Sequence, residues 1–169
     1  MKKVLIIDTS IMCVWLKVPG KETCGPDNNR WTYQRVVEAI EREIAEGSIL
    51  ILPWATIIET GNHIAQAKGD RHEVVNKFVE YVVNALDGNF PWAAFTEQFG
   101  LMERDSLKKT LATWSSTALT GQSLGDAMIV DVVRYYEAYN AEVVILTGDE
   151  GLKAYESAPK STRIPRRNR

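Results

Sequence analysis

The sequence has few cysteines and no strong excess of one charge. Its 169 residues include two cysteines, Cys13 and Cys24, and the formal net charge is −2. Two thiols in this arrangement, with no histidine nearby, predict free thiols of an intracellular protein rather than a disulfide or half of a metal site. The ordinary composition excludes a fibrous protein, an acidic disordered chain and a polycation.

Long hydrophobic segments are also lacking. A membrane span needs about 20 apolar residues, and the longest apolar stretch, near 127–133, is interrupted by Asp131. The run Val4–Ile7 is too short for a secretory signal, which needs about 7–15 apolar residues. We therefore expect a cytoplasmic protein without a membrane segment.

No internal repeat or linker divides the chain, which predicts a single domain over residues 1–159 and a basic tail over 160–169. The tail carries five basic residues and no acid, so its charge is +5 while the rest of the chain carries −7. Such a tail can bind nucleic acid, or it can be only a flexible, solubilising end. The sequence leaves both interpretations open.

Short apolar runs alternate with helical patterns along the chain. The runs 4–7, 49–52 and 143–146 are typical of strands covered on both faces. Helices are expected over the segments that follow or separate them: 33–44, a stretch beginning soon after Pro53, 75–86, part of 96–118, and a buried helix from about 123 to 139. This alternation favours an α/β fold with a parallel sheet.

Four acids lie where such folds carry their chemistry, outside the carboxyl ends of the strands. Asp8 ends the first strand, and Glu59 lies on the helix after the second. Asp126 is in the first turn of the buried helix, and Asp149 follows the last strand. Neighbouring carboxylates repel unless a cation neutralises them. Hard oxygen ligands without clustered cysteine or histidine suit Mg²⁺ or Mn²⁺, so the set predicts metal-assisted chemistry at a phosphate.

Each acid also has a simpler interpretation. Asp126 can be a favourable partner for the helix dipole, Glu59 can belong to a solvated face, and Asp149 can cap the next helix. Asp8 is the hardest to explain in this way, because an acid that closes a buried strand enters a crevice where an unpaired charge is costly.

These residues resemble the motifs of PIN-domain nucleases, the fold of VapC-like toxins. Asp8 in Val-Leu-Ile-Ile-Asp-Thr-Ser looks like the family's first acid, and Glu59 in Ile-Ile-Glu-Thr-Gly matches the second. Asp126 in Leu-Gly-Asp-Ala-Met-Ile-Val and Asp149 in Ile-Leu-Thr-Gly-Asp-Glu-Gly-Leu match the third and fourth. The resemblance covers most of the chain. It implies a three-layer α/β/α fold with a central parallel sheet of four or five strands.

The resemblance also implies an activity, which is Mg²⁺- or Mn²⁺-dependent hydrolysis of a phosphodiester by an endoribonuclease of the toxin–antitoxin type. Asp8, Asp126 and Asp149 would be the main metal ligands. Glu59 would bind metal as well or orient the attacking water. The implied partners are RNA, an antitoxin protein and a second copy of the chain in a homodimer.

Further residues are expected to support this reaction. The Thr147 and Ser10 hydroxyls can position a water or a phosphate oxygen. The segment 11–30 is longer than in the small toxins and is rich in turn formers and basic residues. The candidate substrate-binding residues are Lys17, Lys21, Arg30 and His63.

Other functions remain open. A PIN-fold scaffold could bind RNA or protein without cleaving, although such a scaffold would be expected to have lost an acid. A haloacid-dehalogenase-like phosphatase needs a second Asp two residues after the first, where this chain has Ser10, and no Gly-rich loop supports an NTPase. The aromatic cluster over 90–95 can stack bases or pack in the core or at a dimer contact.

Overall fold

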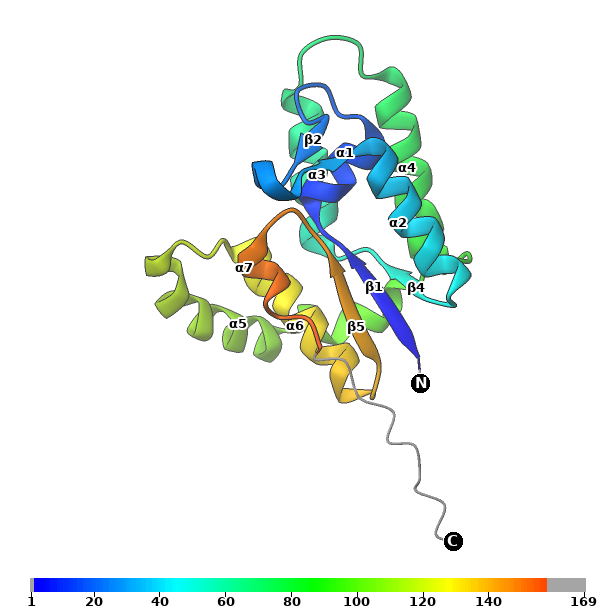
Figure 1. Ribbon diagram of the computed structural model, residues 1–169. Helices are drawn as coiled ribbons and strands as arrows, with labels where there is room; N and C mark the ends of the chain where they lie inside the picture. Colours follow the sequence, from blue (N-terminus) through cyan, green and yellow to red (C-terminus); the bar gives the residue numbers. More distant parts are fainter. Residues whose placement is uncertain (1, 158–169) are drawn as a thin grey trace, which may run out of the picture.

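The central sheet is built from the three apolar runs, as β1 (Lys3–Ile7), β4 (Ile49–Ile51) and β5 (Glu142–Leu146). The computed structural model describes residues 2–157, and in it the strands are parallel in the order β4-β1-β5, with β1 in the middle (Figure 1). Val4–Ile7 are fully buried. Burying each such side chain stabilises the fold by about 1.5–3 kcal/mol, so β1 anchors the molecule.

The α/β fold with a parallel sheet is confirmed, but the expected count of four or five strands is not met. Among residues 2–157 the parallel sheet has three strands. Beyond β4 there is a single parallel bridge between Leu50 and Trp92. In this bridge the Leu50 N–H donates to the Pro91 carbonyl, and the Ala93 N–H donates to the Leu50 carbonyl. Proline has no N–H for a ladder, and a 3₁₀ turn begins at Phe95, so the pairing does not extend into a strand.

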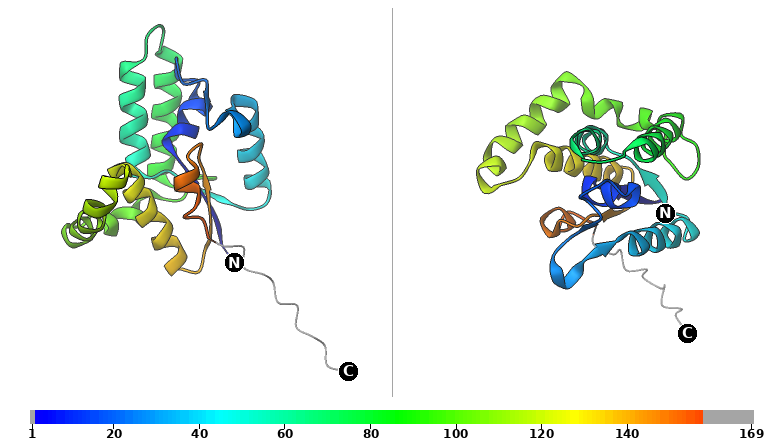
Figure 2. Two further views of the ribbon diagram at one scale, coloured as in Figure 1. Left: turned by 60° about the vertical axis from the view of Figure 1, so that its left-hand side comes forward. Right: turned by 90° about the horizontal axis from the view of Figure 1, so that it is seen from above.

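Helices cover both faces of the sheet because successive strand residues point to opposite sides. Leu5 and Ile7 belong to one core cluster, and Val4 and Ile6 belong to the other. The first cluster is closed by α1 (Thr9–Leu16), α2 (Tyr33–Ala45), α3 (Trp54–Gln66) and α4 (His72–Asp87), and the second by α6 (Leu124–Ala138) and α7 (Glu150–Lys153), as Figure 2 shows. The predicted helices correspond to α2, α3, α4 and α6.

The weakly periodic segment 96–118 forms an outer arm that packs against α6. It consists of η2 (Phe95–Met102), α5 (Arg104–Thr117) and the short turn η3 (Ala118–Thr120), and α5 lies at the left of Figure 1. Only Thr110 of α5 is buried. The weak periodicity follows from this shallow packing.

The segment 11–30, to which the sequence assigned no element, contains most of a helix and the first strand of a hairpin. α1 begins immediately after β1 and has six buried residues out of eight. It was missed because a helix that is apolar on nearly all sides shows no helical period. A short antiparallel hairpin follows, with strands β2 (Thr23–Cys24) and β3 (Trp31–Thr32) on either side of η1 (Asp27–Asn29).

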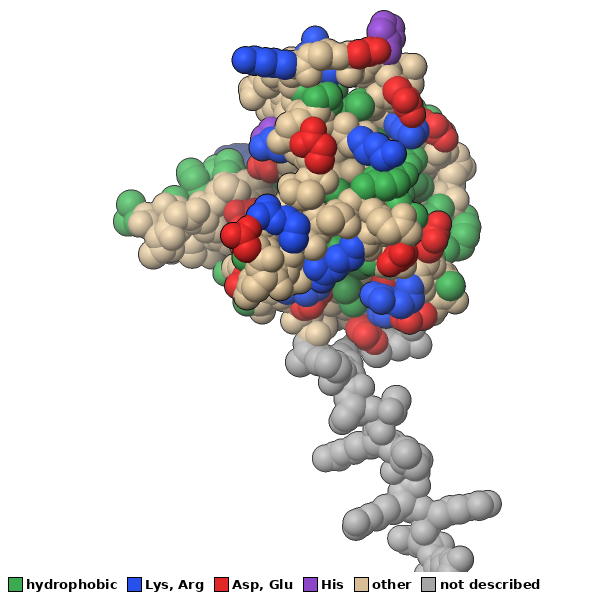
Figure 3. All heavy atoms as spheres, turned by 45° about the horizontal axis from the view of Figure 1, so that its top comes forward, with side chains coloured by type: hydrophobic (Ala, Val, Ile, Leu, Met, Phe, Trp, Pro, Cys, Tyr) green, Lys and Arg blue, Asp and Glu red, His purple; other side chains and the backbone are tan. Residues whose placement is uncertain are grey.

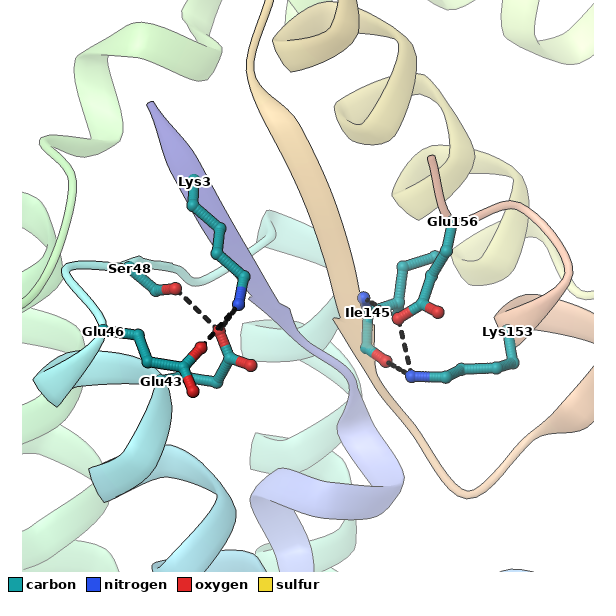
Figure 4. Close-up of polar contacts among 7 residues, drawn as sticks. All are labelled: Lys3, Glu43, Glu46, Ser48, Ile145, Lys153 and Glu156. Atoms are coloured by element: carbon teal, nitrogen blue, oxygen red, sulfur yellow. Dashed lines mark hydrogen bonds and ion pairs between the residues drawn. The ribbon is translucent and has the colours of Figure 1, made fainter. Parts of the chain in front are cut away.

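The outer edge of β5 is covered by the chain that follows α7 (Figure 4). The Ile145 N–H donates to the Glu156 carboxylate at 2.6 Å, and Lys153 Nζ donates to the Ile145 carbonyl at 2.8 Å. Lys153 and Glu156 also form an ion pair. Lys153 and Glu156 thus satisfy the backbone N–H and carbonyl of Ile145 at the sheet edge, which could otherwise pair with another chain.

The amino end of β1 carries a second ionic cluster, also drawn in Figure 4. Lys3 Nζ lies 2.9 Å from Glu43 and 3.0 Å from Glu46, both in or just after the last turn of α2. Ser48 Oγ donates to Glu43 at 2.7 Å. Burial alone would raise the pKa of Glu43, but the Ser48 hydroxyl and the Lys3 ammonium outweigh it and lower that pKa.

The structure also bears on the cysteines and on the aromatic cluster over 90–95. Cys13 and Cys24 are free thiols, as expected. Trp92 and Phe95 are core residues at 6% and 3% exposure, whereas Phe90 is 79% exposed.

No helix within residues 2–157 is both long and apolar enough to cross a membrane. The basic tail over 160–169 lies outside the described residues.

Candidate functional site

The carboxyl ends of β1 and β5 meet at one edge of the sheet and bring the first and last predicted acids together. Asp8 directly follows β1, and its N–H extends the ladder by donating to the Leu146 carbonyl at 3.1 Å. Asp8 is also the N-cap of α1, accepting from the Ser10 N–H. This acid is therefore fixed by a strand end and a helix start at once.

Asp8 is buried in a shell of hydroxyls. It is 5% exposed, and its Oδ2 accepts from Ser10 Oγ and Thr147 Oγ1, each at 2.7 Å. Burial raises the pKa of Asp8, and the hydrogen bonds from Ser10 and Thr147 only partly oppose it. No basic side chain within residues 2–157 forms an ion pair with this carboxylate.

Thr147 connects Asp8 to Asp149. Its hydroxyl donates to Asp8 and accepts from the Asp149 N–H at 2.9 Å. Asp149 Oδ1 accepts from the N–H groups of Gly151 and Leu152, so this residue caps α7. The capping interpretation is therefore correct. It does not exclude a further ligand on Asp149, because both capping bonds use one oxygen.

Glu59 reaches the same edge from α3. Thr9 Oγ1, one residue after Asp8, donates to Glu59 Oε2 at 2.9 Å. A Cβ placed on Gly125 would lie 2.1 Å from Glu59 Oε1, so the carboxylate packs directly against the first turn of α6. Glu59 is half-buried and is not on a simple solvated face. A side chain at position 125 would have to displace the Glu59 carboxylate from its present position.

Asp126 follows Gly125 and has a capping role of its own. Its N–H donates to Ser123 Oγ at 2.9 Å, and its Oδ2 accepts from the Ser123 N–H at 3.3 Å, which completes a capping box. Asp126 and Asp149 line one polar cavity of about 270 Å³, formed with residues of the 117–122 turn and of 151–155. The cavity gives both acids access to a ligand.

The four acids are linked indirectly along one edge. The Thr147 hydroxyl donates to Asp8 and accepts from the Asp149 N–H. Thr9, the residue after Asp8, donates to Glu59, and Glu59 packs against Gly125, the residue before Asp126. Within residues 2–157, no three His, Cys, Asp or Glu side chains converge closely enough to form a ready metal cluster. The donor set nevertheless fits a hard divalent cation, because it consists of oxygens and includes a buried carboxylate without a cationic partner.

The two thiols do not add to this donor set. Burial raises the pKa of Cys13 to about 11 and also raises the pKa of Cys24. Within residues 2–157, neither thiol belongs to a group of three or more His, Cys, Asp or Glu side chains that could hold a metal ion.

The β2–β3 hairpin packs beside the turn that carries Asp149. A Cβ on Gly148 would lie 2.8 Å from both Cys24 Sγ and the Gly25 nitrogen, so the hairpin is in direct contact with the Thr147–Asp149 turn. Arg35 stabilises the hairpin, because its guanidinium stacks on Trp31 at 4.0 Å and donates to the Arg30 carbonyl at 2.9 Å.

The predicted substrate-binding residues are divided between two places. Lys17 Nζ lies 4.1 Å above the Tyr33 ring, and Arg30 pairs with Asp27. These two cations already have partners. Lys21 and His63 instead line a separate cavity of about 450 Å³ between the end of α3 and the loop after α1.

Sequence reasoning missed three contributors to the edge: the Thr9 hydroxyl and the two close-packed glycines, Gly125 and Gly148. Thr9 was signalled by its position beside the first acid, as a polar residue closing an apolar strand. The glycines belong to the Gly-Asp and Thr-Gly-Asp motifs. Their role depends on side chains far away in the sequence, which the motifs do not contain.

Comparisons with known proteins add no relative: no protein-family model, curated protein or solved structure matches this chain. We therefore infer the function from the geometry at the carboxyl ends of the strands.

Proposed function

We propose that the protein is a metal-dependent nuclease that hydrolyses phosphodiester bonds, with RNA as its substrate. The observation that carries the proposal is the gathering of four carboxylates from four separate elements at one sheet edge, with no basic side chain within residues 2–157 pairing with any of them. An acid cluster of this kind repels a phosphate by itself and accepts one when a cation is present.

Each residue has a defined task in this proposal. Asp8, Asp126 and Asp149 would hold Mg²⁺ or Mn²⁺, and Glu59 would hold metal or orient the attacking water. A bound divalent ion would supply charge neutralisation at the phosphate and lower the pKa of a water. Asp8 is held in place by Ser10 and Thr147, and Glu59 is held by Thr9.

The wider setting follows from the resemblance to PIN-domain nucleases. That resemblance supports an endoribonuclease of the toxin–antitoxin type, an antitoxin partner, a homodimer and a cytoplasmic location, all of which stay predictions. The acids and the chemistry of hard cations support metal-assisted chemistry at a phosphate without the resemblance, and the resemblance supports hydrolysis of a phosphodiester.

A non-catalytic scaffold for RNA or protein is the second candidate. It is favoured by the capping roles of Asp126 and Asp149, which give each acid a structural reason to be present. Asp8 also caps a helix, α1, but capping does not account for its burial without a cationic partner within residues 2–157, and Glu59 caps no helix.

The deciding experiment is a cleavage assay on structured RNA, single-stranded RNA and DNA, with Mg²⁺ or Mn²⁺ and with EDTA. The expected result is metal-dependent cleavage of RNA that is abolished in the Asp126→Asn protein. Folded protein that binds RNA and cleaves none of the substrates with either metal would instead support the scaffold.

A further inference from the structure

We propose that the cavity between the end of α3 and the loop after α1 binds a backbone phosphate of the nucleic-acid strand that runs into the acid site. This inference rests on the proposed nuclease function and assigns the path of its substrate. The cavity has a volume of about 450 Å³ and is lined by Pro19, Gly20, Lys21, His63, Gln66, Ala67 and Lys68. None of these lining residues is acidic.

The charge of this cavity favours an anion. Lys21 and Lys68 approach it from different segments, and neither takes part in the ion pairs found within residues 2–157. His63 and Gln66 add hydrogen-bonding groups between them. The nearby Glu22 carboxylate accepts a hydrogen bond from the Gly20 N–H at 2.8 Å and stabilises the turn at Gly20.

Figure 3 shows acidic and basic side chains interspersed over the face turned toward the viewer, without a broad basic area. The chain as a whole is slightly acidic. On this acidic body, Lys21 and Lys68, which form no ion pair within residues 2–157, provide a local basic group together with His63.

The cavity lies in line with the acid site along one helix. Glu59 and His63 are four residues apart on α3, which places them on one face at a rise of about 6 Å. α1 packs beside α3, with Thr9 against Glu59 at one end and Lys21 close to His63 just beyond the other end. The contact between α1 and α3 thus extends from the Glu59 carboxylate toward Lys21.

This arrangement suits a single extended strand. Along the axis of α3, the lining residues His63 and Gln66 lie about 6 and 10 Å from Glu59, which corresponds to one or two steps along an extended backbone. The contact would be made to the backbone only, so it positions the strand and carries no base preference.

The test uses the Asp126→Asn protein with Mg²⁺, which allows binding to be measured without cleavage. A labelled single-stranded RNA of about 12 nucleotides is titrated by fluorescence anisotropy over a range of salt. The test variant is Lys21→Gln with Lys68→Gln. The matched control is Lys2→Gln with Arg42→Gln, which removes the same charge at the amino end of the sheet.

We expect the test variant to bind RNA about tenfold more weakly, while the control is unchanged. The salt slope of the test variant should be smaller by about 0.7 for each phosphate that the lysines no longer neutralise. Equal affinity and slope in the test variant would overturn the proposal and leave the nuclease function standing.

A second readout separates the cavity from the nuclease proposal. Inorganic phosphate is titrated while the ring signals of His63 are followed by NMR, and we expect shifts that disappear in the test variant. If the Asp126→Asn protein with both lysines intact bound no RNA, the nuclease proposal would fail. If phosphate still shifted the His63 ring signals of that protein, the cavity would be a site for free phosphate, and the proposal that it binds a nucleic-acid backbone would be overturned.

Discussion

Two buried carboxylates lie at opposite ends of β1, and their surroundings differ in one respect. Glu43, at the amino end, is 8% exposed and has the Lys3 ammonium at 2.9 Å. Asp8, at the carboxyl end, is 5% exposed and is surrounded by hydroxyls without a cation. The pKa of Glu43 is lowered and that of Asp8 is raised.

The difference shows which acid stabilises the fold and which is held there at a cost. Glu43 is satisfied within the protein, so its charge contributes to stability. The Asp8 carboxylate has no cationic partner within residues 2–157, and burial raises its pKa. Uncompensated charge of this kind is typical of functional sites, and the proposed divalent cation would remove the difference between the two ends.

The largest expected effect is on catalysis at the carboxyl end. Asp126→Asn should reduce metal-dependent RNA cleavage at least about a hundredfold, because it removes a ligand charge with almost no change in volume. Cleavage rates at saturating Mn²⁺ measure the effect. Glu43→Gln, a matched loss of charge at the amino end, should leave the rate per folded molecule unchanged. A fully active Asp126→Asn protein would contradict the site assignment.

A smaller effect is expected from the hydroxyl that joins two of the acids. Thr147→Val should lower activity and Mn²⁺ affinity by about 10- to 100-fold, since groups that orient metal ligands have effects of this size. Calorimetric titration of Mn²⁺ and cleavage at several metal concentrations are the measurements. Thr110→Val removes a comparable hydroxyl on α5 that donates to the Ser106 carbonyl. If both variants behaved alike, Thr147 would have no positioning role.

At the amino end the effect is on stability. Glu43→Gln should reduce the free energy of unfolding by about 1–2 kcal/mol, because it breaks a buried, charge-assisted contact. The lowered pKa means that Glu43 stabilises above its unfolded pKa and that this stability is lost as the pH falls through its folded pKa. Urea denaturation at several pH values tests both points. Glu46→Gln is the exposed control, with an expected loss below about 0.5 kcal/mol.

The smallest expected effect has the opposite sign. Without metal, Asp8→Asn should raise the free energy of unfolding at neutral pH by on the order of 1 kcal/mol. Since burial raises the pKa of Asp8, its contribution is most favourable below the unfolded pKa and is lost as the pH rises through the folded pKa. The gain should therefore shrink in acid. Thermal unfolding is the measurement.

Metal provides the corresponding control for Asp8. Mg²⁺ or Mn²⁺ should raise the melting temperature of the wild-type protein, because a ligand that binds only the folded state stabilises it. The increase should be smaller for Asp8→Asn. An Asp8→Asn protein that is less stable than wild type without metal would show that the carboxylate has a structural partner.

The sequence predicted elements best where pattern and burial coincide. The apolar runs became β1, β4 and β5, and the helix expected from about 123 to 139 is α6, beginning after the Ser123 cap. It failed at α1, whose apolar surface conceals its period. It also overestimated the sheet, because Pro91 and the 3₁₀ turn at Phe95 limit the fourth strand to one bridge.

The sequence by itself determined the acids, their order and their places after the strands, because a buried apolar run that ends in a polar residue marks a strand end. Only the tertiary structure decided their contacts. Thr147 meets Asp8 across 139 positions of the chain, and Thr9 meets Glu59 across 50. Such contacts arise from the parallel pairing of β1 with β5 and the packing of α1 on α3, neither of which a local pattern specifies.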